Sequence, residues 1–367
     1  MQKMNRNRKK VLVVTNHSYM LWRFRKELIQ ELMKTSEVAL SMPFVGHEDD
    51  FQKMGLRCIE TNVDRRGINP VKDLKLLRTY KKILKEERPD LVITYSIKPN
   101  IYAGWLCGRM KIPFCANVQG LGTAFQKAGM AQFVTFLYRK AFRKVQTVFF
   151  ENAGNAEEFQ KRRIIPSDKQ LILNGAGINL EDYALEPYPE NEKIHFLYLG
   201  RIMKEKGIDE LFAAARRLHS ENSNFVLDLV GFFEDEYKEQ AEQLEKDGIA
   251  VFHGFQEEPR PFYAMADCVV LPSYHEGMSN VLLEAAATGR PVITSDIPGC
   301  REAVEQNVSG FLVKAKNSDS LYRAMRQMTE MSRESRAAMG AAGRKKMELE
   351  FDKKKIVADT LQGMRGM

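Results

Sequence analysis

Two glutamates near the end of the chain stand eight positions apart, in a segment that predicts a loop followed by a buried helix. Ser279 is a good N-cap and Gly289 a good residue to follow a helix end, so positions 280–288 are expected to be helical. Glu276 lies in the loop and Glu284 inside the helix, among apolar residues on every side. Because a buried carboxylate is costly without hydrogen-bond donors, Glu284 is expected to bind either a protein arginine or the hydroxyl groups of a ligand.

A second cluster of polar groups follows the expected strand 194–199. Gly200 permits a tight exit from the strand, and Arg201 and Lys206 stand in the loop that leads into the expected helix 208–218. An arginine fork, an ammonium group and the amides of a helix N-terminus together suit a diphosphate. The alternative is an ordinary basic loop in solvent.

The loop before the 280–288 helix adds backbone amides that can hold phosphate oxygens. The four residues concerned are Gly277, Met278, Ser279 and Asn280. The carboxylates of Glu276 and Glu284 can accept hydrogen bonds from sugar hydroxyls. A diphosphate beside sugar hydroxyls is the chemistry of a nucleotide sugar, so these two clusters predict a nucleotide-sugar site.

Short apolar or β-branched runs alternate with longer helical patterns, which is typical of parallel sheets covered by helices. In the first half the expected strands are 10–14, 38–42, 91–94, 114–118, 147–150 and 170–173. In the second half they are 194–199, 225–230, 250–253, 268–271, 292–295 and 311–313. The predicted fold class is therefore α/β, with two Rossmann-like domains.

The chain of 367 residues is long for one compact core, so two domains of ordinary size are expected. The segment 186–192, with two prolines, is interpreted as the linker, which gives a first domain of residues 1–187 and a second of residues 188–350. A final helix, 351–367, is expected to return to the first domain. Because parallel sheets of this type bind ligands at the carboxyl ends of their strands, the domains are expected to face each other across a cleft.

The net charge of +8 is unevenly distributed. Residues 1–187 hold 32 Lys and Arg against 19 Asp and Glu, a net +13, whereas residues 188–367 hold 24 against 29, a net −5. A basic half attracts phosphates, nucleic acid or anionic lipid headgroups, and charge alone does not choose among them. Solvated lysines on helix surfaces are an equally good interpretation.

The cysteines and the N-terminus give few functional clues. The five cysteines are odd in number, scattered and without a C-x-x-C pair, so neither a disulfide framework nor a zinc site is expected. The apolar run 11–14 is too short for a signal peptide or a membrane span, and a cytoplasmic protein is expected.

The two motifs with Arg201 and Lys206 and with Glu276 and Glu284 resemble those of glycosyltransferase family 4. Members of that family have the two-domain GT-B fold and retain the anomeric configuration of the donor sugar. Within the family, the chain is similar to bacterial capsule, exopolysaccharide and N-glycan enzymes that extend a sugar on undecaprenyl diphosphate. Further matching segments are 24–25, 96–100, 120–122, 174–179 and 299–302.

The resemblance implies a role for each motif residue. Arg201 and Lys206 would hold the donor diphosphate and neutralise the departing nucleoside diphosphate, which the resemblance indicates is UDP. Glu284 would accept the ribose hydroxyls, and Glu276 would bind the donor sugar near the reacting carbon. Such preorganised opposite charge stabilises both the leaving group and an oxocarbenium-like centre.

The first domain carries residues that are expected to contact the acceptor. It also contains the positions at which this sequence departs from the family pattern. Gly120 and Gly122 would let backbone amides approach a phosphate or sugar, although a plain turn is the alternative. Gln119 stands where many relatives carry His or Glu, and since an amide cannot act as a base it would only position hydroxyls. His17, in a first loop that lacks the family's glycines, is either a ligand contact or a structural histidine.

The resemblance implies a retaining route without an enzymic base, in which the departing phosphate oxygen takes the acceptor proton. No metal is expected, since the chain has no Asp-x-Asp motif. Lys98 and Arg25, together with Arg65 and Arg66, are expected to bind a lipid-linked diphosphate.

The basic, aromatic helix 131–144 is expected either to lie on an anionic membrane, at the cytoplasmic face, or to pack as an ordinary helix. The alternative functions are a nucleic-acid-binding protein, for which no recognisable module is present, and a UDP-sugar epimerase of the same fold. The oligomeric state is not predicted.

Overall fold

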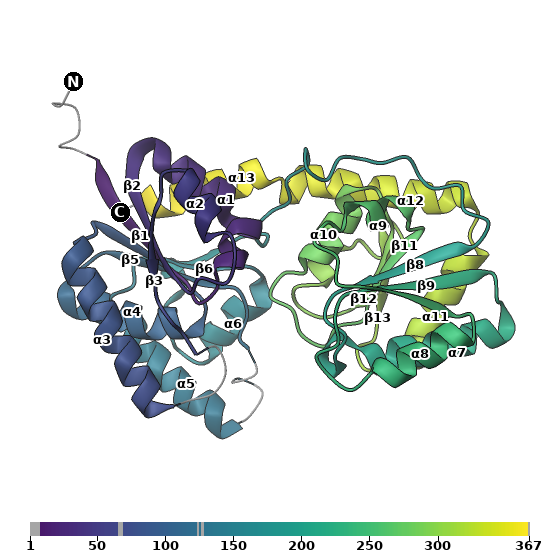
Figure 1. Ribbon diagram of the computed structural model, residues 1–367, viewed down its shortest axis with the longest axis horizontal. Coiled ribbons are helices and arrows are strands. Elements are labelled where there is room, and N and C mark those ends of the chain that lie inside the picture. The colour runs from purple at the N-terminus through teal and green to yellow at the C-terminus, as the bar shows by residue number, and fades with distance from the viewer. Residues whose placement is uncertain (1–7, 65–68, 123–124, 126–127, 366–367) are drawn as a thin grey trace. The chain divides into compact units, whose positions relative to one another are not determined.

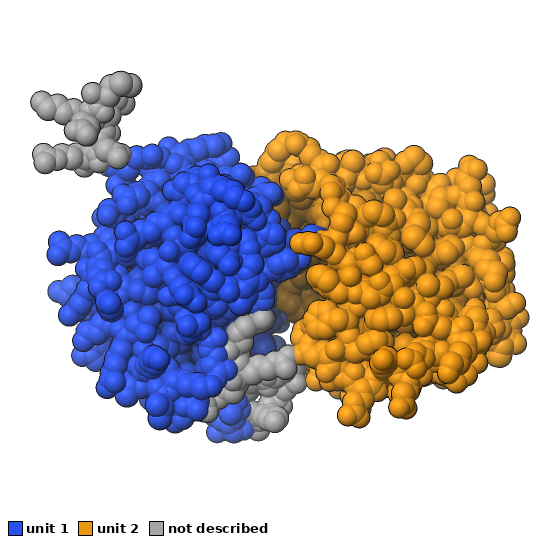
Figure 2. Space-filling view, viewed as in Figure 1, with its two compact units in different colours: residues 1–176, 355–367 blue, residues 177–354 orange. Residues whose placement is uncertain are grey.

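The computed structural model describes residues 8–64, 69–122, 125 and 128–365, and it divides into two compact units. Unit 1 consists of residues 1–176 and 355–367, and unit 2 of residues 177–354 (Figure 2). Arg65 and Arg66, which were expected to contact a lipid diphosphate, lie outside the described residues. Each unit has its own parallel sheet (Figure 1). Each unit also has its own hydrophobic core.

Unit 1 contains a seven-stranded parallel sheet in the order β3-β2-β1-β4-β5-β6-β7. Its strands are β1 (Lys9–Val14), β2 (Ser36–Met42), β3 (Arg57–Glu60), β4 (Leu91–Tyr95), β5 (Phe114–Val118), β6 (Val148–Phe150) and β7 (Gln170–Ile172). Its helices are α1 (Ser18–Thr35), α2 (Glu48–Lys53), α3 (Pro70–Glu87), α4 (Ile97–Met110), α5 (Ala128–Ala141) and α6 (Ala153–Lys161). Strand order reverses direction beside β1, as in doubly wound α/β folds.

Unit 2 contains a six-stranded parallel sheet in the order β10-β9-β8-β11-β12-β13. Its strands are β8 (Ile194–Leu199), β9 (Phe225–Val230), β10 (Ala250–Gly254), β11 (Cys268–Leu271), β12 (Val292–Ser295) and β13 (Gly310–Val313). Its helices are α7 (Ile208–Glu221), α8 (Lys238–Lys246), α9 (Arg260–Met265), α10 (Asn280–Ala287), α11 (Ser318–Glu330) and α12 (Arg333–Lys346). The predicted pair of Rossmann-like domains is confirmed.

The last helix, α13 (Lys353–Arg365), continues from unit 2 into unit 1. Ile356, Val357 and Met364 are buried in the same core cluster as residues of β1 and α1. A Cβ on Gly363 would lie 2.8 Å from the ring of Phe149, so the helix backbone packs directly on the sheet. The expected return of the chain end to the first domain is confirmed.

The boundary between the units lies at 176/177, eleven residues before the predicted position, because residues 177–192 pack on unit 2. Ile178 forms a parallel bridge with Asp352: its amide donates to the Phe351 carbonyl at 2.7 Å, and its carbonyl accepts from Lys353 N at 2.9 Å. The second boundary is 354/355, four residues after the predicted one. The prolines of 186–192 thus mark an extended strap on unit 2.

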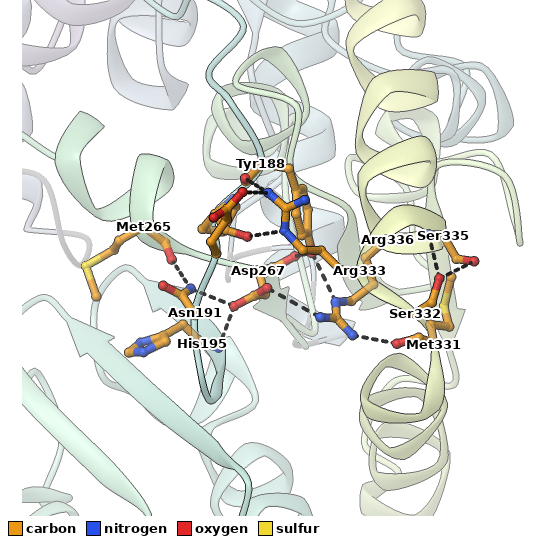
Figure 3. A network of polar contacts seen from close by, with 12 residues as sticks. Tyr188, Asn191, His195, Met265, Asp267, Met331, Ser332, Arg333, Ser335 and Arg336 are labelled. Atoms are coloured by element: carbon orange, nitrogen blue, oxygen red, sulfur yellow. Dashed lines mark hydrogen bonds and ion pairs between the residues drawn. The ribbon is translucent and has the colours of Figure 1, made fainter.

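Side chains of unit 2 fasten this strap (Figure 3). The Tyr188 hydroxyl donates to the Asp267 carbonyl at 2.7 Å and accepts from Arg336 Nε at 3.2 Å. Asn191 donates to the Asp267 carboxylate at 2.8 Å, and the fully buried Arg290 donates to the Pro187 carbonyl at 2.8 Å. Because the strap's backbone acceptors are satisfied by unit 2, it belongs to that unit and is not a free linker.

Candidate functional site

Glycines allow the loops at the carboxyl ends of the unit 2 strands to touch each other through their backbones. A Cβ on Gly231, after β9, would lie 1.8 Å from the Gly200 carbonyl oxygen after β8. A Cβ on Gly207 would lie 2.1 Å from the Pro272 carbonyl oxygen after β11. No larger residue fits these approaches without a backbone shift. The loops that carry the predicted nucleotide-sugar motifs are therefore held together by direct backbone packing.

Lys206 and Glu276 form an ion pair in this loop cluster. Lys206 ends a short 3₁₀ turn (Lys204–Lys206) before α7, and Glu276 lies in the loop between β11 and α10. Lys206 Nζ stands 2.5 Å from Glu276 Oε1, and both side chains are partly buried. The structure thus joins the two motifs that were expected to bind the diphosphate and the sugar, although 70 residues separate them.

Arg201 lies directly after β8 and pairs with Glu234, which follows β9. The distance from Arg201 Nη1 to Glu234 Oε2 is 2.5 Å. The Tyr198 hydroxyl donates to the Arg201 carbonyl, also at 2.5 Å, which fixes the backbone at this exit from the strand. The guanidinium is the more exposed partner, so it faces solvent from a fixed position.

Glu284 is buried in α10, and the Tyr263 hydroxyl donates to its Oε2 at 2.9 Å. A donor to this buried carboxylate is therefore present in Tyr263 of α9.

The four residues expected to offer amides to a phosphate, 277–280 at the start of α10, have different environments. Ser279 occupies the N-cap position, but its side chain makes no capping hydrogen bond, and its amide donates to the Gly299 carbonyl at 2.8 Å. Met278 is buried in the core of unit 2, whereas Gly277 and Asn280 are half-buried. A Cβ on Gly299 would lie 2.4 Å from the Gly277 carbonyl oxygen. Gly299 therefore shapes this loop from outside the predicted motif.

The predicted cations of unit 1 are both in ion pairs. Arg25, in α1, pairs with Glu151 after β6, and both side chains are buried. Lys98, at the start of α4, pairs with Asp73 of α3 at 2.8 Å. In this structure, both positive charges are neutralised by carboxylates of the same unit.

The remaining predicted contacts of unit 1 lie at the carboxyl ends of β1 and β5. His17 occupies the N-cap position of α1, half-buried, and its ring meets that of Tyr19 edge-on. Gln119 and Gly120 follow β5 and are half-buried. Gly122 has φ +68°, a conformation that favours glycine, and a Cβ there would meet the end of the Ile97 side chain at 2.9 Å.

Three residues beside the Arg201 loop were not predicted from the sequence. Glu234 is the partner of Arg201, and Phe232 and Phe255 are large exposed aromatics after β9 and β10, with ring centroids 6.2 Å apart. The signal that could have found them is their position after β9, the neighbour of the motif strand β8, and after β10, the next strand along, since the carboxyl ends of parallel strands carry ligand contacts.

Three observations concern other kinds of site in the described residues: a metal cluster, a reactive thiol and a membrane span. Across that part of the chain, His, Cys, Asp and Glu do not gather in threes to form a metal site. Burial raises the pKa of Cys58 to about 11 and of Cys107 and Cys115 to about 12, so these thiols are protonated near neutral pH. Among the described helices, not one has the length and apolarity needed to span a bilayer.

Family models identify both halves of the chain. The family described as "Glycosyl transferase 4-like" matches residues 10–152, and that described as "Glycosyl transferases group 1" matches residues 185–346. The chain belongs to the glycosyltransferases that combine these two domains, and it is a hexosyltransferase.

Curated relatives match over most of their length. The N,N'-diacetylbacillosaminyl-diphospho-undecaprenol alpha-1,3-N-acetylgalactosaminyltransferase of Campylobacter jejuni is 28% identical over 321 residues, covering 82% of this chain and 84% of that protein. The capsular polysaccharide biosynthesis glycosyltransferase CapM of Staphylococcus aureus is 27% identical and covers 82% of each chain. The UDP-Gal:alpha-D-GlcNAc-diphosphoundecaprenol alpha-1,3-galactosyltransferase of Escherichia coli is 27% identical, covering 72% of this chain and 73% of that one.

Solved structures confirm the GT-B fold. Anabaena HepE, in a complex with UDP and glucose, superposes with a TM-score of 0.82 at 16% identity, covering 98% of this chain and all of that one. The sucrose-phosphate synthase of Thermosynechococcus elongatus gives a TM-score of 0.76 at 19% identity, covering 98% and 99%. At these identities the likeness concerns the fold alone.

Proposed function

We propose that this hexosyltransferase moves a hexose or N-acetylhexosamine from a UDP-sugar to a saccharide on a polyprenyl diphosphate, with retention of configuration. The observation that carries the proposal is the Lys206–Glu276 pair, which sets a phosphate-binding cation against a sugar-binding carboxylate at the carboxyl end of the unit 2 sheet. The names of the C. jejuni and E. coli relatives, with their diphospho-undecaprenol acceptors and alpha linkages, support the acceptor class and the retaining outcome.

The donor site of the proposal is built from unit 2. Arg201 and Lys206 hold the diphosphate, and their positive charges stabilise the UDP that departs. Glu276 exchanges its ion pair with Lys206 for the hydroxyls of the donor sugar once the phosphate occupies the lysine. Glu284 accepts the ribose hydroxyls through its carboxylate, to which the Tyr263 hydroxyl also donates.

The transfer step needs no side-chain base. When the bond between the anomeric carbon and the phosphate oxygen breaks, that oxygen gains negative charge on the face where the acceptor hydroxyl attacks. The phosphate oxygen takes the hydroxyl proton as the new glycosidic bond forms, and UDP leaves. Gln119 orients hydroxyls, since an amide does not take up a proton at neutral pH. The proposal requires no metal, because two cationic side chains supply the charge that a metal would provide.

We further propose that unit 1 attaches the enzyme peripherally to the inner face of an anionic membrane through α5. Phe133 and Phe136 are exposed on this helix, and Lys140 Nζ stands 5.5 Å from the Phe136 ring centroid. Exposed aromatics beside basic residues suit a lipid headgroup region. In a flotation assay with anionic vesicles, the wild-type protein should float with the vesicles and the Phe136→Ser variant should not. The Leu349→Ser variant, changed at an exposed apolar position of unit 2, should float as the wild type does.

The direct test is a screen of UDP-sugars for slow hydrolysis, followed by transfer to a short-chain lipid-diphosphate saccharide. Glu276→Ala should abolish transfer without unfolding the protein, and Glu257→Ala, at an exposed position of unit 2, should leave it unchanged. An active Glu276→Ala variant would refute the site. Conversion of one UDP-sugar into its epimer without transfer would instead indicate an epimerase.

A further inference from the structure

The backbone of Glu234 is held beside the loop that carries Arg201. The Glu234 amide donates to the Ile202 carbonyl at 3.1 Å, and the Ile202 amide donates to the Phe232 carbonyl at 2.8 Å. The Asp235 carboxylate accepts from Lys204 N at 2.8 Å. The loop after β9 thus runs along the loop after β8, and Ile202 between them is fully buried. Glu234 cannot move independently of the Arg201 loop.

The ion pair has one fixed and one movable member. The side chain of Glu234 is 16% exposed, whereas that of Arg201 is 45% exposed. Ordinary surface ion pairs contribute little because two long side chains must be ordered to form them. Here the Glu234 side chain is mostly buried on an anchored backbone, so most of the ordering cost falls on the exposed arginine. The guanidinium is therefore aimed by Glu234.

The ion pair with Glu234 uses only one nitrogen of the Arg201 guanidinium. Arg201 Nη1 donates to Glu234, and within the described residues the structure assigns no hydrogen bond to Nε or Nη2. The Nε–Nη2 edge carries two parallel N–H groups, which is the edge that binds a phosphate with two hydrogen bonds. Glu234 can thus hold the arginine while that edge receives a ligand.

We propose that Glu234 is a positioning residue for the donor diphosphate, acting through Arg201. This inference rests on the proposed function, because it requires Arg201 to bind the diphosphate. Glu234 orders the guanidinium before the donor arrives, so the donor does not have to immobilise a flexible arginine on binding. It touches neither the sugar nor the reacting atoms.

The test measures UDP binding by calorimetry in four variants of the full chain. Glu234→Ala removes the acceptor and should weaken UDP binding about tenfold, whereas Glu234→Gln keeps an acceptor oxygen and should lose less than about threefold. Glu236→Ala, at an exposed carboxylate two residues further on, is the matched control and should bind as the wild type does. Arg201→Ala gives the loss of UDP affinity that results from removing the arginine itself, with which the Glu234 variants are compared.

The double variant Arg201→Ala/Glu234→Ala separates positioning from folding. If Glu234 acts through Arg201, the second substitution should cause no additional loss of UDP affinity. A further loss in the double variant, or tighter UDP binding by both Glu234 variants, would overturn the positioning role. Wild-type affinity in Glu234→Ala, with Arg201→Ala weakened, would overturn this inference alone. Wild-type affinity in Arg201→Ala would overturn the proposed donor site as well.

Discussion

The two arginines expected to bind ligands differ in exposure between the two units. In unit 1 the Arg25 side chain is 5% exposed and its partner Glu151 11%, so this pair is part of the interior. In unit 2 the Arg201 side chain is 45% exposed, on loops that glycines pack together. Unit 2 presents this guanidinium at its surface, whereas unit 1 holds Arg25 in its interior. The lysines differ little, since the side chain of Lys98 is 13% exposed and that of Lys206 is 19% exposed.

Net charge therefore does not locate the side chains that we propose bind phosphate. The basic half of the chain, with a net +13, neutralises Arg25 and Lys98 internally. The acidic half, with a net −5, carries the arginine and lysine that best suit a diphosphate. The local arrangement at strand ends, and not the overall charge, decides where an anion can be held.

After Glu276→Ala, the largest effect should come from Lys206→Ala, which tests whether unit 2 holds the leaving group. Removal of a preorganised cation at a site of developing negative charge should lower transfer at least about a hundredfold. Steady-state transfer to the lipid-diphosphate acceptor measures the loss. Lys204→Ala removes an exposed lysine of the same turn and should retain activity. Equal rates for both variants would show that unit 2 does not hold the leaving group through Lys206.

Arg25→Leu tests whether the unit 1 pair is structural. It leaves Glu151 in the interior without its cation and should lower the free energy of unfolding by about 3–5 kcal/mol, measured by urea denaturation. The double variant Arg25→Leu/Glu151→Leu should recover most of this stability. Stable variants with impaired use of the acceptor would instead assign Arg25 to ligand binding.

Gly207→Ala tests the backbone packing of the unit 2 loops. Its φ of +76° and the overlap of a Cβ with the Pro272 carbonyl should together cost about 2–3 kcal/mol in the free energy of unfolding. Gly248→Ala is the matched control, because φ is +71° and the Cβ would have nothing within 4 Å, so only about 1 kcal/mol should be lost. Equal losses at both positions would contradict the packing argument.

The smallest effect concerns His195 of β8. Its hydrogen bond with the buried Asp228, 2.7 Å from Nδ1, raises the pKa of His195, against burial and Lys193, which lower it. A raised pKa in the folded state stabilises the protein below the unfolded pKa, and this contribution is lost as the pH rises through the folded value. The wild type should therefore lose more stability than His195→Gln between about pH 5.5 and pH 8. A parallel decline in both proteins would rule this contribution out.

Most strands could be predicted because their apolar runs are bounded by polar or turn residues. The runs 114–118, 194–199 and 225–230 were predicted to the residue. Strand β3, Arg57–Glu60, was missed because it has four residues at the sheet edge, with a charged residue at each end. The assignment of 186–192 as a linker was wrong because packing on Arg290 and Asp267 is not visible in a proline-rich segment.

The site residues could be named from their motifs, but most of their partners could not. The chain separates Lys206 from Glu276 by 70 residues and Arg25 from Glu151 by 126, and no local pattern links such pairs. Tyr263, which donates to Glu284, lies on a six-residue helix without a motif. These contacts follow from strand order, which brings distant loops to one edge of a sheet.

The bridge between Ile178 and Asp352 lies beside both points where the chain passes between units. It belongs to unit 2, so a gene fragment for residues 177–354 keeps both strands of the bridge. Unit 1 is not a contiguous gene fragment, because α13 must be supplied after residue 176. Its separate expression therefore calls for a fusion of 355–367 to 1–176 through a designed connector, as in circular permutation.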